Sequence, residues 1–214
     1  MGKIGIMGGT FDPIHNGHLL LGEQAYYEYG LDQIWYMPSG QPPHKKDHRV
    51  TDSHIRLEMT RLAMEGREGF SCSDFEVMRS GNTYTSQTLE ILHEKYPGHT
   101  FYFIIGADSL YEIEHWHEPA KVMAQAVILA AVREYESAGR SMETQIAYLK
   151  EKYQADVRML HCREIDISSA ELRRMTALGE SIEPFVPEPV ARYIKEHHLY
   201  QEVAECRKSP GTRR

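Results

Sequence analysis

Short apolar runs alternate along this chain with longer segments of helical periodicity. Continuous apolar runs of this length are typical of strands that are buried on both faces of a parallel sheet. Five runs are predicted to be strands: Lys3–Met7, Gln33–Met37, Thr100–Ile105, Ala126–Val132 and Val157–Leu160. With helices between the strands and right-handed crossovers, the pattern predicts an α/β fold, a doubly wound parallel sheet with helices on both faces. The ligand of such a sheet binds beyond the carboxyl ends of its strands.

The run GGTFDPIHNGH, residues 8–18, joins the first predicted strand to the first predicted helix. Free N–H groups and the positive dipole end make a helix N-terminus a site for phosphate. His15 and His18 are three residues apart, so both imidazoles are expected on one side of the helix start. The glycine spacing fits neither GxxxxGK[ST] nor GxGxxG. Metal ligation is not favoured, because the glutamate of HExxH is missing and no cysteine is near, although the glycines alone also fit a plain turn.

Two further segments are predicted at the same edge of the sheet. SGQPPHKK follows the second strand, and its His44 and Lys45 are candidates to hold phosphate, with a solvated basic loop as the alternative. GADS follows the strand that ends at Ile105, where Asp108 is a candidate for hydrogen bonds with a ribose and, equally, for capping the next helix. Trp116 is a candidate to stack on a base or to pack in the core.

Hydroxyl residues precede two predicted helices. The segment 81–88, GNTYTSQT, leads into a helix predicted over Ser86–Tyr96, and its hydroxyl and N–H groups fit a carboxylate or an amide. The segment 167–173, ISSAELR, begins another helix, and Arg173 lies one turn later, suited to the terminal phosphates of a triphosphate. Ordinary N-capping explains both sets of hydroxyls as well.

Charge and cysteine content narrow the class of protein. The net charge is −7 although the last eight residues, RKSPGTRR, hold four basic residues and no acid, so no nucleic-acid partner is expected. The three cysteines are widely spaced without a CxxC pair, which indicates a reducing compartment. No signal peptide is recognised, and the longest nearly apolar stretch, 122–132, is about half a membrane span. A cytoplasmic protein that does not bind membranes is expected, whereas the oligomeric state, including a homo-oligomer, stays open.

Taken together, TFDPIHNGH and ISSAELR resemble the two signature segments of the nucleotidyltransferase superfamily. More narrowly, PPHK at 42–45, YTSQTL at 84–89, GADSL at 106–110 and Trp116 resemble bacterial nicotinate-nucleotide adenylyltransferases in order and spacing. The resemblance extends to about Tyr200 and implies one Rossmann-like domain over residues 1–200, with a small helical part at about 168–200. Residues 201–214 are expected to be a basic, disordered tail.

That resemblance implies adenylyl transfer from ATP to nicotinate mononucleotide, with Mg²⁺ bound with ATP and no covalent intermediate. The catalytic residues that it implies are His15, His18, Lys45 and Arg173. It implies ATP contacts at Gly8, Gly9, Thr10, Phe11, His15, His18, Gly106, Asp108, Ile167, Ser168, Ser169 and Arg173. It implies acceptor contacts at His44, Lys45, Tyr84, Thr85 and Trp116, and no metal ligand from the protein.

The chain departs from the family pattern at Ala170, where threonine is usual, at His117, where an aromatic is common, and at Glu112, where a second stacking tyrosine is sometimes found.

Two alternative functions remain. Pantetheine-phosphate adenylyltransferases share the first and last motifs but are shorter and lack the PPHK and Trp116 context. A nucleotide-sensing module would keep the cleft without turnover, and it would not need contacts that serve only the transition state.

Overall fold

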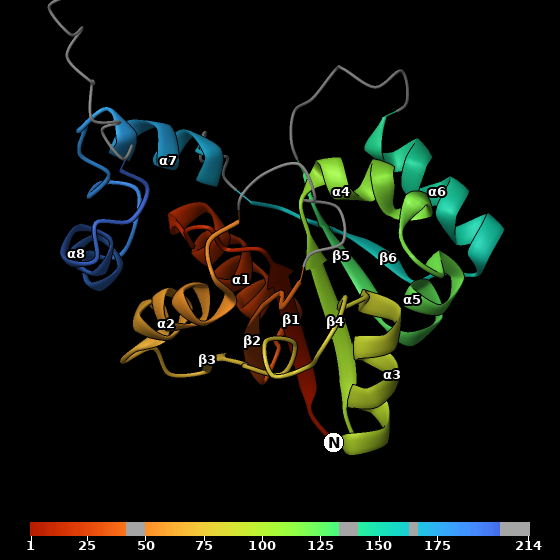
Figure 1. Ribbon diagram of the computed structural model, residues 1–214. Coiled ribbons are helices and arrows are strands. Elements are labelled where there is room, and N and C mark those ends of the chain that lie inside the picture. Colours follow the sequence, from red (N-terminus) through yellow and green to blue (C-terminus); the bar gives the residue numbers. More distant parts are fainter. Residues whose placement is uncertain (42–49, 133–140, 163–166, 202–214) are drawn as a thin grey trace, which may run out of the picture.

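Six parallel strands form one sheet in the order β3-β2-β1-β4-β5-β6 (Figure 1). The computed structural model describes residues 1–41, 50–132, 141–162 and 167–201. The strands are β1 Lys3–Gly9, β2 Gln33–Pro38, β3 Phe70–Cys72, β4 Thr100–Ile105, β5 Val127–Ala131 and β6 Val157–Leu160. The five predicted strands are confirmed to within two residues at each end, and the edge strand β3 was not predicted. The strand order reverses between β1 and β4, the point where such sheets bind their ligands.

Helices cover both faces of this sheet, as predicted. The helices are α1 Asn16–Tyr29, α2 Ser53–Met64, α3 Thr85–Lys95, α4 Ala107–Glu112, α5 Pro119–Gln125, α6 Met142–Tyr153, α7 Ser169–Ala177 and α8 Glu188–Glu196, with a 3₁₀ turn η1 at Ile113–His115. Helices α3 to α6 lie on one side, and α1, α2, α7 and α8 lie on the other (Figure 1). No helix in the described ranges is both long enough and apolar enough to span a membrane.

Alternation along the central strands divides the interior into two cores. In β4, Phe101, Phe103 and Ile105 pack toward α3 to α6, whereas Tyr102 and Ile104 pack toward α1 and α2. Successive side chains of a strand point to opposite faces, so an apolar run with no polar position supplies both cores at once. This double burial explains why the strands have no polar alternation in the sequence.

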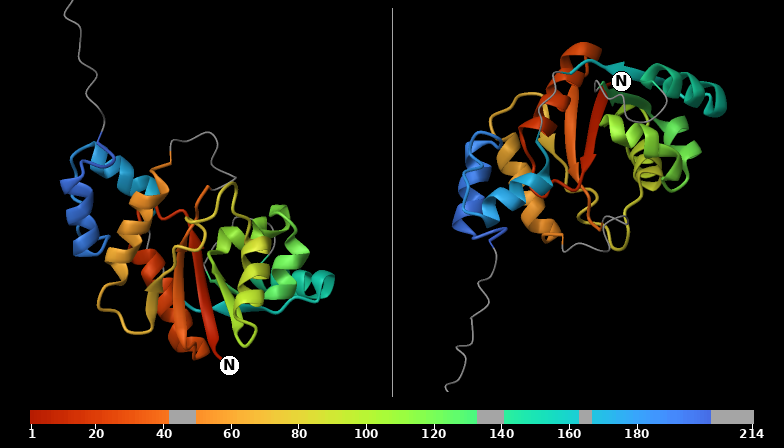
Figure 2. Two further views of the ribbon diagram at one scale, coloured as in Figure 1. Left: turned by 60° about the horizontal axis from the view of Figure 1, so that its bottom comes forward. Right: turned by 90° about the horizontal axis from the view of Figure 1, so that it is seen from above.

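The C-terminal helices add to the core on the α1 and α2 side of the sheet. Figure 2 shows α8 beside α2. Leu172 of α7 and Val190 and Ile194 of α8 are buried, and α8 packs against α2. Tyr200 reaches back to the start of the chain, where its hydroxyl donates to Asp12 Oδ1 (2.7 Å). The expected basic tail lies outside the described residues from position 202 onward.

Candidate active site

A cavity of about 710 Å³ lies at the carboxyl edge of the sheet, beside the ends of β1 and β4. Helices α1, α3, α4 and α7 all begin at its wall, so several helix N-termini face one space. Most of the predicted site residues line this cavity: Gly8, Gly9, Thr10, His15, His18, Tyr84, Thr85, Gly106, Trp116, Ile167, Ser168, Ser169 and Arg173. Segments that are distant in the sequence are therefore brought together as predicted.

His15 and His18 form a stacked pair at the start of α1. His15 is the N-cap residue, and the centroids of the two rings are 3.8 Å apart. His18 Nδ1 accepts the backbone N–H of His15 (3.3 Å), so a neutral His18 carries its proton on Nε2 and can donate it to a ligand. Phe11 packs edge-on against the His18 ring, with centroids 5.0 Å apart. The orientation of His18 is thus fixed from two sides.

His15 is held in its neutral form. Its side chain is buried, and burial lowers its pKa to about 4. A Cβ added to Gly17 would lie 3.0 Å from the imidazole Nδ1, so this glycine lets the backbone pass close to the ring. The buried His15 ring therefore adds no charge to the start of α1 at neutral pH.

Helix α7 is attached to the turn that precedes α1. Ser168 is its N-cap, and its hydroxyl accepts the N–H of Glu171 (3.1 Å), so the capping interpretation is confirmed for this residue. The hydroxyl of Ser169 donates to the Pro13 carbonyl (2.9 Å), and Arg173 Nη1 donates to the Asp12 carbonyl (2.7 Å). These two bonds fix the second signature segment against the first.

Both helix starts leave backbone donors available at the cavity. At α1, Asn16 donates its N–H to the Phe185 carbonyl, and His18 donates its N–H to the His15 carbonyl. Within the described residues, the N–H groups of Gly17, Ser169 and Ala170 have no hydrogen-bond partner, and all three residues line the cavity. Such donors at a helix N-terminus suit phosphate oxygens.

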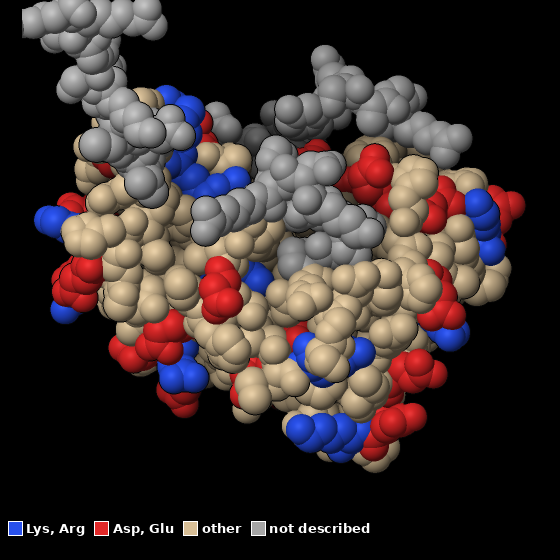
Figure 3. Space-filling view, in the orientation of Figure 1, with Lys and Arg blue, Asp and Glu red and all other residues tan. Residues whose placement is uncertain are grey.

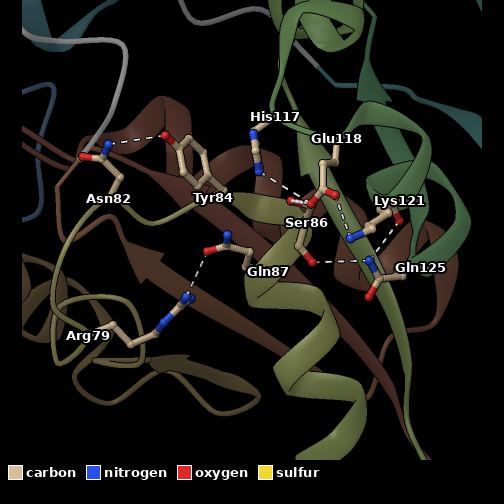
Figure 4. A network of polar contacts seen from close by, with 9 residues as sticks. All are labelled: Arg79, Asn82, Tyr84, Ser86, Gln87, His117, Glu118, Lys121 and Gln125. Atoms are coloured by element: carbon tan, nitrogen blue, oxygen red, sulfur yellow. Dashed lines mark hydrogen bonds and ion pairs between the residues drawn. The ribbon is translucent and has the colours of Figure 1, made fainter.

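The opposite wall is built by the start of α3 and the turn before α5. Tyr84 caps α3 and stacks on His117, with centroids 4.2 Å apart. Glu118 joins the two segments: it accepts the Ser86 hydroxyl (3.4 Å), pairs with Lys121 (2.7 Å) and lies 3.6 Å from His117 Nε2 (Figure 4). This network holds Thr85 close to the cavity.

Trp116 lies in this wall and packs against the core, which is one of its two predicted roles. Its ring is partly exposed to the cavity and makes an edge-to-face contact with Phe103, with centroids 6.0 Å apart. One side of the indole therefore packs in the core, while the residue still lines the space where a planar ring can stack.

Four predicted residues are not seen at the cavity wall. The side chain of Phe11 is buried beneath it, with only 1% of its surface exposed, because the ring packs between His18 and Tyr36. Asp108 lies exposed in the first turn of α4 and is not among the lining residues. His44 and Lys45 fall outside the described residues.

Several lining residues were not predicted from the sequence, and Glu76, Cys162 and Phe103 show why. Glu76 follows the unpredicted strand β3, accepts the Thr88 hydroxyl (2.7 Å) and has its pKa raised by burial. Cys162 follows β6, so the rule that ligands meet the carboxyl ends of strands was a usable signal. Phe103 is one of five consecutive buried apolar residues of β4, and nothing in the sequence distinguishes it from the other four.

The charged side chains at the cavity are few. Among its described lining residues, Arg173 is the only lysine or arginine and Glu76 the only acid. Over the described part of the face seen in Figure 3, basic and acidic side chains are interspersed. An anion is therefore attracted by backbone dipoles, histidines and Arg173 rather than by a broad basic surface.

Comparison with known proteins agrees with this geometry. The family model described as cytidylyltransferase-like matches residues 6–175. A probable nicotinate-nucleotide adenylyltransferase of Lachnoclostridium phytofermentans is 44% identical over 200 residues, covering 94% of this chain and 100% of the relative. The chain belongs to the nicotinate-nucleotide adenylyltransferase family. A second member of the family, from Clostridium tetani, is 39% identical over 204 residues, with 94% of this chain and 100% of the relative covered.

Solved structures share the fold. The Plasmodium falciparum nicotinic acid mononucleotide adenylyltransferase complexed with NaAD superposes with a TM-score of 0.76 at 23% identity and covers 94% of this chain and 98% of its own. The same enzyme complexed with APC gives a TM-score of 0.75 at 22% identity, with the same coverage. The Rossmann-like fold expected from the family resemblance is confirmed.

Proposed function

We propose that this chain transfers the adenylyl group of ATP to nicotinate mononucleotide, giving nicotinate adenine dinucleotide and pyrophosphate. The observation that carries the proposal is the pair of helix starts, α1 and α7, which place His18, Arg173 and backbone N–H groups without a partner among the described residues at one cavity. The names of the curated relatives support the same reaction, as do the NaAD and APC complexes of the Plasmodium falciparum enzyme. The pantetheine-phosphate alternative is not favoured.

The reaction is a single displacement at phosphorus. An oxygen of the mononucleotide phosphate forms a bond to the α-phosphorus of ATP, and the bond from that phosphorus to the β-bridging oxygen breaks. The electron pair of the broken bond leaves with pyrophosphate. The protein forms no bond to the adenylyl group, so its work is to align the two phosphates and to stabilise the spreading charge.

On the ATP side, we assign the transferring phosphate to His18 and the leaving pyrophosphate to α7. His18 donates from Nε2, because its Nδ1 is engaged by the backbone. Arg173 uses one nitrogen on the Asp12 carbonyl and keeps further N–H groups for phosphate oxygens. The N–H groups of Ser169 and Ala170 supply the helix-terminus donors, so the alanine in place of threonine at 170 removes a hydroxyl but no backbone donor.

We assign the acceptor to the wall formed by Thr85 and Trp116. The indole stacks on the pyridine ring, and backbone N–H groups at the start of α3 meet the carboxylate. An amide in this position would present its NH₂ group to these donors, so the acid is favoured over nicotinamide mononucleotide. His44 and Lys45 remain predicted phosphate contacts between the two substrates.

Mg²⁺ enters with ATP in this proposal. In the described ranges there is no group of three potential metal ligands among His, Cys, Asp and Glu side chains, and both carboxylate oxygens of Asp12 are engaged, by Tyr200 and by the Thr51 N–H. This fits an ion that is bound mainly by phosphate oxygens and water. When bound, Mg²⁺ neutralises the charge that builds up on the phosphates.

The test is pyrophosphate release with ATP and each of three acceptors: nicotinate mononucleotide, nicotinamide mononucleotide and phosphopantetheine. With nicotinate mononucleotide, release should require ATP and Mg²⁺ together, and it should be slower when the amide replaces the acid. Turnover with phosphopantetheine alone would assign the other adenylyltransferase activity. ATP binding without turnover on any acceptor would indicate a sensor.

A further inference from the structure

Arg56 in α2 is a buried cation, and in the described part of the chain its hydrogen bonds all go to backbone oxygens. It is 1% exposed, and it does not line the cavity. Its four hydrogen bonds go to main-chain carbonyls: Nε to Thr51 (2.8 Å), Nη1 to Thr10 (2.6 Å), and Nη2 to Ser39 (2.8 Å) and Gly40 (3.1 Å). A fully buried arginine is rare unless it is paired, so an arrangement of carbonyls alone calls for an explanation.

The four carbonyls belong to three segments that meet at the carboxyl edge of the sheet. Thr10 follows β1, Ser39 and Gly40 follow β2, and Thr51 leads into α2. Thr10 and Ser39 line the cavity, so Arg56 holds two parts of its wall from behind. In the sequence, Gly40 and Thr51 bracket the segment that contains His44 and Lys45.

Neighbouring contacts reinforce the same junction. The Ser39 N–H donates to the Gly9 carbonyl (2.8 Å), and the Thr51 N–H donates to Asp12 Oδ2 (3.2 Å). Asp12 is itself buried, and its negative charge opposes the lowering of the Arg56 pKa by burial. A residue of the first signature segment therefore partly offsets the cost of burying this charge.

We propose that Arg56 is a positioning residue for adenylyl transfer, which sets the spacing between the loop after β1 and the loop after β2. This inference rests on the proposed function, in which the two phosphates react in the cavity that Thr10 and Ser39 line. Arg56 touches neither substrate, so its effect passes through the backbone of Thr10 and Ser39. A displacement of about 1 Å in such an arrangement can lower a rate about 100-fold.

Lysine cannot replace this arginine. The guanidinium presents five N–H donors in a rigid plane, whereas an ammonium has three donors at one point. With four carbonyl bonds in the wild type, Arg56→Lys keeps the charge but leaves at least one carbonyl unbound. The two loops then lose the side chain that joins them, while the attraction between the positive charge at position 56 and Asp12 remains.

The control is Thr60→Val, one turn along the same helix. Thr60 is fully buried, and its hydroxyl donates to the carbonyl of Arg56 (2.8 Å), so this substitution also removes a buried hydrogen bond from α2. It leaves the four carbonyls of Arg56 in place. Loss of helix stability is thereby separated from loss of loop position.

The experiment measures kcat, KM for ATP, KM for nicotinate mononucleotide and the melting temperature of each purified protein, with kinetics well below melting. We expect Arg56→Lys to lower kcat about 100-fold with each KM within about threefold of the wild type, because alignment rather than binding is lost. Thr60→Val should lower the melting temperature and keep kcat within about twofold.

Gly40→Ala keeps the inference testable if Arg56→Lys does not fold. A Cβ at this position would lie 2.5 Å from the Glu76 carbonyl, so the substitution pushes the Gly40 carbonyl away from an intact Arg56. The same selective loss of kcat is expected. Wild-type kcat in a folded Arg56→Lys or Gly40→Ala protein would overturn the inference alone, as would an equal loss of kcat in Thr60→Val. A wild-type protein with no turnover would overturn both the function and the inference.

Discussion

Burial of a neutral histidine at the start of α1 should make the stability of the protein depend on pH. His15 has a pKa of about 4 in the folded state, whereas the unfolded chain has the ordinary value of 6.5. Between these values the unfolded chain binds a proton that the folded state does not, so the free energy of unfolding rises with pH in this window and is flat above it. At pH 5 this one group lowers the stability by about 2 kcal/mol relative to pH 7.

The perturbation is His15→Asn, which keeps a good N-cap residue and removes the titrating ring. Urea unfolding of both proteins at pH 5, 6, 7 and 8 gives their free energies of unfolding. The wild type should lose about 2 kcal/mol more than the variant between pH 7 and pH 5, with a constant difference between pH 7 and pH 8. Parallel curves from pH 5 to pH 7 would refute the assignment of a buried neutral imidazole at this position.

Three further predictions concern other parts of the structure. His18→Ala should lower kcat about 100- to 1000-fold with an unchanged melting temperature, and normal turnover would exclude its role as a donor to the transferring phosphate. Trp116→Ala should raise KM for nicotinate mononucleotide about tenfold and KM for ATP less than twofold, and equal changes in both would argue against stacking on the acceptor. Gly22→Ala places a Cβ 2.1 Å from the hydroxyl of the buried Tyr36 and should lower the free energy of unfolding by about 1–3 kcal/mol in urea, whereas Gly98→Ala, with open space around it, should not.

The strands and helix starts could be predicted because each leaves a local pattern. The apolar run before GGTFDPIHNGH is continuous, and Ser168 precedes a helix with a typical capping residue. Strand β3 was missed because Phe70–Cys72 is three residues long, too short for a periodic pattern. Because β3 was not predicted, Glu76 was missed too, since it lines the cavity from the segment that follows β3.

The motif residues of the cavity wall could be predicted, whereas the contacts that hold the wall from behind could not. Arg56 looks like any charged residue of an amphipathic helix, since its four acceptors are carbonyls that the sequence does not distinguish. Phe11 was assigned to ATP from its place in the motif, and its burial follows from contacts with His18 and Tyr36 that depend on tertiary packing. The assignments of His44 and Lys45 stay predictions.

The most direct test of adenylyl transfer follows oxygen atoms from the acceptor into the product. Nicotinate mononucleotide labelled with ¹⁸O in its phosphate is incubated with unlabelled ATP, Mg²⁺ and the protein. The masses of both products are then measured by mass spectrometry. Attack of the mononucleotide phosphate on the α-phosphorus predicts nicotinate adenine dinucleotide that retains every labelled oxygen, together with unlabelled pyrophosphate. Loss of label from the dinucleotide, label in pyrophosphate, or no dinucleotide at all would contradict the account.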